Sequence, residues 1–201
     1  MKNTIKIAIQ KKGRLNEPSL VFLSAIGINN QQNGHCYITI CKKTNTEIIL
    51  VRDDDIPEYV SQGVVDFGIV GENVLAEKGI YTNIIRRLGF GNCQLVIAAP
   101  KDSLIKTTAD LEGKRIATSY PQLLSKYLRI NNINAAIVNL DGSVEIAPSL
   151  NLADAICDIT QTGQTLKENG LIPIETIVKS EAVLIESPFE NSNKQKFLNL
   201  I

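Results

Sequence analysis

Residues 145–166 read EIAPSLNLADAICDITQTGQTL, an apolar run followed by a polar turn. Ala155–Cys157 is predicted to end a strand, which makes Asp158 the first polar side chain beyond it, and open α/β sheets bind ligands at that edge. Gly163 lets the backbone of the next turn approach an anion closely. A carboxylate just before such a turn suits hydrogen bonds to vicinal ribose hydroxyls. The segment therefore predicts a ribose 5-phosphate site, although a strand, a turn and a capped helix without any ligand would use the same residue types.

The turn is also predicted to open a short helix over residues 164–169 with Thr162 as its N-cap. Free N–H groups and the helix dipole would then point toward the bound phosphate. The predicted ribose 5-phosphate site, called the donor site below, comprises Glu145, Asp154, Asp158, Thr160, Gln161, Thr162, Gly163, Gln164 and Thr165.

Six blocks of this chain resemble, in order, those of the ATP phosphoribosyltransferase family, whose enzyme opens histidine biosynthesis. They are IAIQKKGRL (7–15), VRDDDIPEYVSQGVVDFGIVGENVL (51–75), LGFGNCQLVIAAP (88–100), KRIATSYPQLL (114–124), GSVEIAP (142–148) and the segment 145–166. Together they cover most of residues 5–185. One departure concerns Asn151, where many members carry glycine; asparagine also tolerates unusual backbone angles.

The resemblance implies a reaction in which N1 of ATP displaces pyrophosphate from C1 of 5-phosphoribosyl 1-diphosphate. The product would be N1-(5-phosphoribosyl)-ATP, and Mg²⁺ would be held mainly by substrate phosphates, with no protein ligand. Such a transfer develops positive charge on the ribose and negative charge on the leaving oxygens, so positioning and charge stabilisation matter more than a covalent nucleophile. The residues predicted as catalytic are Asp158, Arg14 and Lys11.

A basic cluster around Gly13 follows the first predicted strand. Alone it would be read as a solvated turn, but a triphosphate must be neutralised and an arginine fork suits phosphate oxygens. Arg52 and Asp53 follow another strand, where the acid could orient the arginine or accept from an adenine amino group. Two further strand-to-helix turns contain polar groups that could instead be helix caps, and an aromatic in one of them could stack on a purine. The predicted ATP site comprises Lys11, Gly13, Arg14, Arg52, Asp53, Glu72, Ser119 and Tyr120.

Short β-branched runs alternate with helical patterns, which is typical of βαβ units and mixed, mostly parallel sheets. No linker separates the halves, so the crossings near residues 90 and 172 are predicted to be strands. We expect an α/β fold like that of type II periplasmic binding proteins, with a ligand cleft between two lobes. The first lobe, on the ATP side, would comprise residues 1–89 plus 173–201, and the second, on the donor side, residues 90–172. Predicted strands are 5–9, 37–41, 47–51, 64–70, 93–98, 114–118, 135–140, 153–157 and a pair over 174–185.

The composition of the 201 residues argues against several classes of function. Lys plus Arg and Asp plus Glu both number 21, which gives no broad field for nucleic acid or an anionic membrane. No stretch reaches the roughly 18 apolar residues of a membrane span and no secretory signal is evident, so a cytoplasmic location is expected. The four cysteines lack zinc spacing and should be free thiols. His35 is the only histidine and so the only candidate for histidine-based acid–base chemistry.

Two rival functions remain at this stage. A non-catalytic small-anion binding protein of the same fold is one, although it would not need the turn after Asp158. The other is a phosphoribosyltransferase of the more common type, which usually has two consecutive acids before its turn. Long members of the resembled family carry a C-terminal regulatory domain, whereas short members use a partner similar to histidyl-tRNA synthetase. The motifs of this chain are more similar to those of the long form, although that domain is lacking. A homo-oligomer, at least a dimer, is expected.

Overall fold

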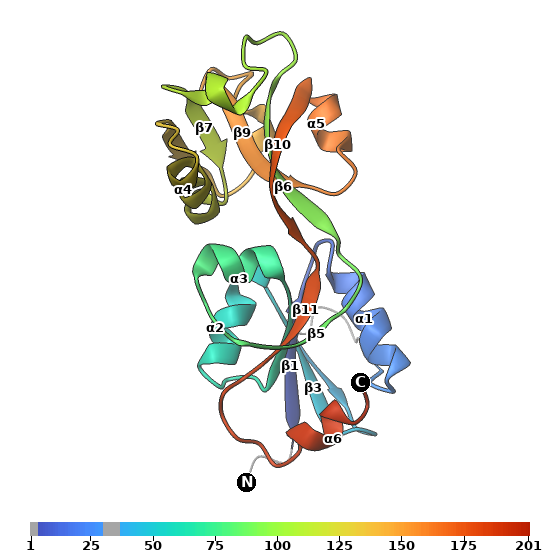
Figure 1. The fold of residues 1–201 in the computed structure, drawn as a ribbon. Coiled ribbons are helices and arrows are strands. Elements are labelled where there is room, and N and C mark those ends of the chain that lie inside the picture. The colour runs from blue at the N-terminus through green and yellow to red at the C-terminus, as the bar shows by residue number, and fades with distance from the viewer. Residues whose placement is uncertain (1–3, 30–36) are drawn as a thin grey trace. The chain divides into compact units, whose positions relative to one another are not determined.

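The computed structural model describes residues 4–29 and 37–201, which form two units. Unit 1 contains the described residues up to Gly91 together with Glu181–Ile201, and unit 2 contains Asn92–Ser180. Each unit is an α/β layer structure with its own sheet and its own core (Figure 1). The second boundary lies eight residues later than predicted, because the strand that begins near residue 172 stays paired within unit 2 along its length.

The sheet of unit 1 has the strand order β2-β3-β1-β4-β11-β5. Its centre, β3-β1-β4, is parallel, whereas β2, β11 and β5 pair in antiparallel fashion. The elements are β1 (Ile5–Gln10), α1 (Asn16–Ala25), β2 (Ile38–Cys41), β3 (Thr46–Val51), the 3₁₀ turn η1 (Asp53–Asp55), α2 (Ile56–Ser61), β4 (Phe67–Gly71), α3 (Glu72–Lys78), β5 (Asn83–Arg87), β11 (Ala182–Glu186) and α6 (Lys194–Leu198).

Strand β1 divides the core of unit 1 into two layers, because successive side chains of a strand point to opposite faces. Ile5, Ile7 and Ile9 lie in a cluster with side chains of α1 and α6. Ala8 lies in a second cluster with side chains of α2 and α3. Helices therefore cover both faces of the sheet, and the loops after β1, β3 and β4 emerge at one edge.

The sheet of unit 2 has the order β10-β6-β9-β7-β8, with parallel pairing of β9, β7 and β8 and antiparallel pairing of β10, β6 and β9. One face is covered by α4 and the other by η3 and α5. The elements are β6 (Cys93–Pro100), η2 (Thr108–Leu111), β7 (Arg115–Thr118), α4 (Pro121–Ile130), β8 (Ala136–Asn139), η3 (Val144–Ile146), β9 (Ala155–Thr160), α5 (Gln164–Glu168) and β10 (Leu171–Ser180).

The predicted α/β class with two mixed sheets is confirmed, with some corrections of detail. Parallel pairing is limited to β3-β1-β4 in unit 1 and to β9-β7-β8 in unit 2, and the other strand pairs are antiparallel, so the description as mostly parallel is wrong. Strand β9 continues to Thr160, so Asp158 lies inside the strand and not beyond it. The edge strand β5 was not predicted, because its pattern of exposed and half-buried residues has no apolar face. No helix of the described residues is long and apolar enough to cross a membrane.

Asn151 has a φ of 57°, in the left-handed region that glycine adopts at little cost. This angle belongs to the turn between η3 and β9, in which the Leu152 N–H donates to the Ala147 carbonyl oxygen at 3.0 Å. Asparagine tolerates such angles better than other residues with a Cβ atom. The presence of asparagine where many members of the resembled family carry glycine is therefore compatible with an ordinary turn geometry.

We predict that Asn151→Gly keeps the free energy of unfolding within about 0.5 kcal/mol of the parent, whereas Asn151→Ala lowers it by about 1 kcal/mol, since alanine disfavours positive φ. Urea unfolding of the three proteins measures the difference. An alanine variant as stable as the glycine variant would contradict the role of the backbone angle.

Candidate functional site

Asp158 lies at the centre of a polar cluster in unit 2. The pairing of β7 with β9 ends at Thr118 and Cys157, so Ser119 and Asp158 are the next residues along two adjacent parallel strands. The Ser119 hydroxyl donates to the Asp158 carboxylate, and the Glu145 carboxylate of η3 is close enough to interact with it. The structure thus brings together three predicted site residues that are separated by up to 39 positions in the sequence.

The environment of Asp158 disfavours its charged form. Burial is the largest cause and raises the pKa of this carboxyl above its ordinary value. The Ile159 N–H and the Ser119 hydroxyl oppose that shift by donating to the carboxylate, while repulsion from Glu145 adds to it. The groups that set the pKa of Asp158 include no lysine or arginine. Such a carboxylate suits a ligand that brings its own hydroxyl donors or positive charge.

The turn after Asp158 is held by its own hydroxyl groups. The Gly163 N–H donates to Thr160 Oγ1 at 2.9 Å, and the Gln164 N–H donates to Thr162 Oγ1 at 3.3 Å. The prediction of Thr162 as the N-cap is wrong by one residue: Gly163 occupies that position with φ of 76°. Helix α5 has only five residues, which is too short for a strong dipole. Anion binding here would rest on the shape of the turn.

The remaining polar residues of the turn, Gln161, Gln164 and Thr165, are exposed. The Gln161 amide donates to the Asn92 carbonyl oxygen at 3.3 Å, and the Gln164 amide donates to Glu168 at 2.6 Å. Thr165 is exposed, and its carbonyl oxygen accepts from Asn169. No other atom lies within 4 Å of the place where a Cβ of Gly163 would stand, so the turn is open on that side.

Asp154 does not belong to this cluster. It immediately precedes β9 at the opposite end of the strand and accepts from Arg115 through three bonds: backbone N–H at 2.8 Å, Nε at 3.2 Å and Nη2 at 3.0 Å. These bonds, the side-chain contact first, hold the pKa of Asp154 below its ordinary value. The structure therefore argues against a donor-binding role for Asp154 and indicates that it anchors β7 to β9.

The predicted groups of unit 1 lie at the edge where its parallel strands end. Gln10, Val51 and Gly71 are the last residues of β1, β3 and β4. The residues that follow them include Lys11, Gly13, Arg14, Arg52, Asp53 and Glu72. Arg14 is half-buried and donates to the Gly91 carbonyl oxygen at 2.8 Å and to Asn73 Oδ1 at 3.2 Å.

The other basic and acidic groups at this edge differ in their surroundings. Lys11 Nζ lies 3.6 Å from the centre of the exposed Tyr37 ring, and its hydrogen bond and charge lower the pKa of Tyr37. Arg52 is exposed beside Asp53 of η1. Glu72 accepts from Arg87 at 2.6 Å, so its carboxylate already belongs to an ion pair within the protein. Lys11 and Arg52 are thus better placed than Glu72 to meet a ligand.

Tyr120 in unit 2 is partly committed to the core. Its ring packs against the cluster that contains Leu123 and Leu124 of α4, and its N–H donates to Thr118 Oγ1 at 2.9 Å. The ring remains half-buried rather than exposed. Stacking of a purine on Tyr120 therefore stays a prediction, limited to the part of the ring outside the core.

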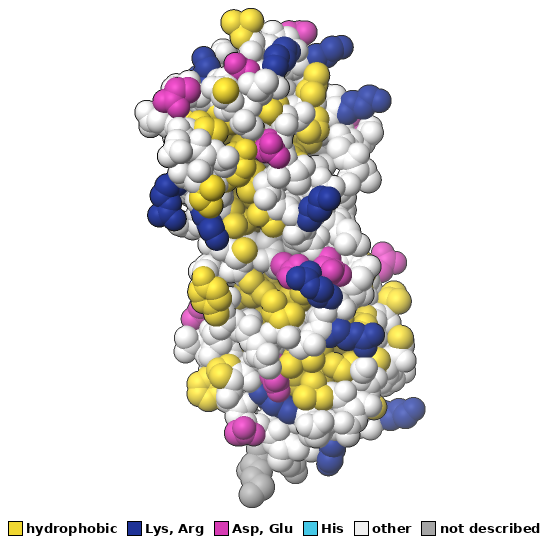
Figure 2. Space-filling view, in the orientation of Figure 1, with side chains coloured by type: hydrophobic (Ala, Val, Ile, Leu, Met, Phe, Trp, Pro, Cys, Tyr) yellow, Lys and Arg dark blue, Asp and Glu magenta, His cyan; other side chains and the backbone are white. Residues whose placement is uncertain are grey.

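The described residues contain no group of three or more His, Cys, Asp or Glu side chains that could hold a metal ion. His35 and Cys36 lie outside the described residues. Cys41, Cys93 and Cys157 are buried, and none of these three thiols is in a disulfide bond. Figure 2 shows acidic and basic side chains interspersed over the face it draws, so anion binding must depend on local groups.

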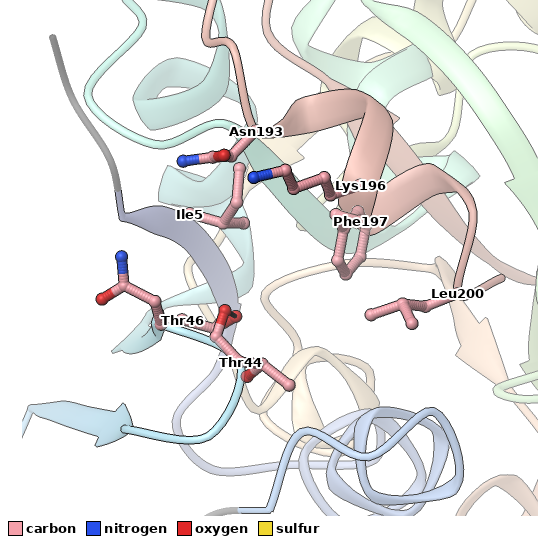
Figure 3. A pocket seen from close by; sticks show the side chains of 8 residues that line it. Ile5, Thr44, Thr46, Asn193, Lys196, Phe197 and Leu200 are labelled. Atoms are coloured by element: carbon pink, nitrogen blue, oxygen red, sulfur yellow. Dashed lines mark hydrogen bonds between the residues drawn. The ribbon is translucent and has the colours of Figure 1, made fainter.

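A cavity of about 410 Å³ in unit 1 lies away from these residues (Figure 3). It is formed at the beginning of β1 and β3 and along α6, at the sheet edge opposite to Arg14. Its lining includes Ile5, Thr46, Lys196 and Phe197. It contains none of the predicted site residues.

Sequence reasoning missed three residues that position the others. Gln10 accepts from the Leu15 N–H at 2.8 Å and shapes the loop after β1, Asn73 contacts Arg14, and Arg115 binds Asp154. A polar residue at the end of the apolar strand IKIAIQ was the available signal for Gln10. The partners of Arg14 and Arg115 lie far away in sequence, so no local pattern indicated them.

Comparison with known proteins shows which protein family the chain matches. Residues 52–201 match the sequence model of the HisG family, described as ATP phosphoribosyltransferase. The chain is 45% identical over 199 residues to the ATP phosphoribosyltransferase of Cytophaga hutchinsonii, covering 99% of this chain and 70% of that protein. It is 46% identical over 191 residues to that of Maricaulis maris, covering 92% and 65%. The chain thus spans about two thirds of these relatives' length.

Solved structures support the same relationship. A chain of the ATP phosphoribosyl transferase (HisG:HisZ) complex from Thermotoga maritima aligns with a TM-score of 0.83 and 32% identity, covering 98% of this chain and 96% of that one. The alkanesulfonate-binding protein SsuA from Xanthomonas axonopodis pv. citri aligns with a TM-score of 0.64 and 18% identity, over 98% of this chain and 69% of its own. The second likeness concerns the fold alone, which is that of periplasmic binding proteins, as predicted.

We predict that Asp158→Asn raises the free energy of unfolding at pH 7. Because the folded-state pKa of Asp158 lies above its unfolded value of about 3.9, its charged form is less stable in the folded protein, and asparagine removes that cost. The advantage should shrink as pH falls from the raised pKa toward about 3.9. Urea unfolding at several pH values measures it, and a variant less stable than the parent at pH 7 would contradict the effect of burial.

The opposite sign is expected for Asp154→Asn. The pKa of Asp154 is lowered in the folded protein, so its contribution to stability is present above about pH 3.9 and is lost as pH falls through the lowered value. Both partners are partly exposed, with side chains 46% and 35% accessible, so we expect a loss of about 1 kcal/mol at pH 7. An unchanged unfolding midpoint, or a raised KM for a ribosyl donor without loss of stability, would contradict the anchoring role.

Proposed function

The chain belongs to the ATP phosphoribosyltransferase family, as its sequence blocks predicted, and from that premise we propose that it transfers a 5-phosphoribosyl group to ATP. In this reaction the lone pair of N1 of the adenine forms a bond to C1 of 5-phosphoribosyl 1-diphosphate. The bond from C1 to the pyrophosphate oxygen breaks, and pyrophosphate leaves with the electron pair. The product is N1-(5-phosphoribosyl)-ATP.

The cluster around Asp158 is the observation that carries this proposal. The groups that set the pKa of the Asp158 carboxyl include no lysine or arginine, Glu145 lies close enough to repel its charged form, and Ser119 donates a hydrogen bond to it. Vicinal ribose hydroxyls can donate to these oxygens, and positive charge that develops on the ribose ring is stabilised by a nearby carboxylate. The turn over residues 160–165 follows directly and would receive the 5-phosphate.

Unit 1 would supply the groups for ATP. Arg14 and Lys11 offer positive charge for the phosphates, and Arg52 with Asp53 lies at the same sheet edge. Mg²⁺ would accompany the substrate phosphates, because this ion keeps several waters and is usually bound through phosphate oxygens in nucleotide enzymes. No residue of the chain is assigned as a base, because the attacking nitrogen carries a lone pair.

The assembly is a separate proposal. We expect a homo-oligomer, with a partner of the HisZ kind as the alternative, since the Thermotoga maritima chain of similar length is described in a HisG:HisZ complex. Gel filtration with light scattering distinguishes a self-association of this chain from a monomer that needs a second protein.

We predict that Asp158→Asn lowers kcat/KM for 5-phosphoribosyl 1-diphosphate by about 10- to 150-fold, because one charge-assisted hydrogen bond contributes about 1.5–3 kcal/mol. Absorbance of the product formed from ATP and the donor measures the rate. Asp102→Asn, an exposed carboxylate in the same unit, is the matched control and should leave the rate unchanged. An effect below about twofold for Asp158→Asn would rule out its role at the ribose.

A further inference from the structure

Asn73 stands out because it is 1% exposed and contacts a half-buried arginine with a neutral side chain. We propose that Asn73 is a positioning residue that orients the Arg14 guanidinium toward the phosphate groups of ATP. This inference rests on the proposed function, in which Arg14 contacts those phosphates. Asn73 would act through Arg14 and would not touch the substrate.

Two acceptors determine the orientation of the guanidinium plane. Nη1 donates to the Gly91 carbonyl oxygen at 2.8 Å, and Nη2 donates to Asn73 Oδ1 at 3.2 Å. A planar fork that is bonded at both terminal nitrogens cannot rotate freely. These bonds use two of the five N–H donors of the side chain, which leaves three for other acceptors.

Gly71 reserves the space for this contact. A Cβ at this position would lie 2.4 Å from Asn73 Oδ1 and 3.3 Å from Arg14 Nη2. The backbone does not require glycine here, because φ is −73° and ψ is 139°, angles that any residue adopts. The absence of a side chain at position 71 is therefore explained by the approach of Asn73 to Arg14.

The charge of Arg14 is treated differently from that of two other arginines. Arg87 is paired with the carboxylates of Glu72 and Glu181, and Arg115 is paired with Asp154. Both Arg14 acceptors described here are neutral, so they fix the side chain without cancelling its charge. An arginine that is oriented but not neutralised is suited to binding an anion, whereas a purely structural arginine gains more from a carboxylate.

The test measures binding of ATP, adenosine and inorganic tripolyphosphate by titration calorimetry for the parent, Asn73→Ala, Asn73→Asp and Arg14→Gln. Asn73→Ala should weaken the binding of ATP and of tripolyphosphate about tenfold, since one hydrogen bond to a charged group corresponds to about that factor in affinity. The binding of adenosine, which has no phosphate, should weaken less than twofold. Asn73→Asp should weaken ATP and tripolyphosphate binding at least as much as Asn73→Ala, because its carboxylate would pair with Arg14 and cancel the positive charge that the neutral amide leaves available. The KM for ATP should rise in Asn73→Ala while the KM for the ribosyl donor stays unchanged.

Asn191→Ala is the matched control. Asn191 is also a buried asparagine of unit 1, but it donates to Asp66 and to the Thr4 carbonyl oxygen at the beginning of β1. Asn191→Ala should lower the unfolding midpoint without lowering the affinity for ATP. It therefore separates an effect of stability from an effect of Arg14 orientation.

Two results would overturn the inference while leaving the proposed function intact. One is that Asn73→Ala binds ATP as tightly as the parent while Arg14→Gln binds it more weakly. The other is that Asn73→Ala loses as much affinity for adenosine as for ATP. Parental ATP affinity in Arg14→Gln would instead refute the role of Arg14 in the proposed function, and the inference with it.

Discussion

The parallel pairing of the central strands is the constraint on which both sites depend. In unit 1 the register of β3, β1 and β4 makes all three strands end within one residue of the same level, with Gln10 opposite Val51. In unit 2 the register of β7 and β9 places Ser119 next to Asp158. Antiparallel strands complete the sheet of unit 1 on both sides and that of unit 2 on one side, but they do not bring consecutive loops to one edge. The polar residues of each unit gather because these few parallel strands end together.

A second constraint is the energetic conflict at Asp158. The strand that carries it is buried through Cys157, so the carboxyl enters an environment that raises its pKa. One N–H and one hydroxyl compensate only in part, and Glu145 makes the charged form still less favourable. An ionisable group whose charged form lowers the stability of the folded protein is typical of functional sites. Asp154, four residues earlier, has the reverse balance, since Arg115 satisfies it fully enough to lower its pKa.

Arginines illustrate the same distinction for positive charge. Where a carboxylate faces the guanidinium, as at Arg87 and Arg115, the pair holds chain segments together. Where neutral acceptors face it, as at Arg14, the orientation is retained and the charge remains available. The kind of acceptor, more than the exposure of the arginine, separates Arg87 and Arg115 from Arg14, the arginine that we propose contacts a ligand.

The sequence by itself determined the α/β class, most strands and helices, and the family, because these depend on local periodicity and on motifs that are contiguous; the roles of Asp158 and Arg14 stay predictions of the same motifs. Only the tertiary structure decided that Asp154 anchors β7, that Glu72 is occupied by Arg87, and that Asn73 and Gly91 hold Arg14. An aspartate that meets a ligand and one that meets an arginine look alike in sequence. Their partners lie 15 to 77 residues away and are selected by strand register and chain crossings, which local patterns do not encode.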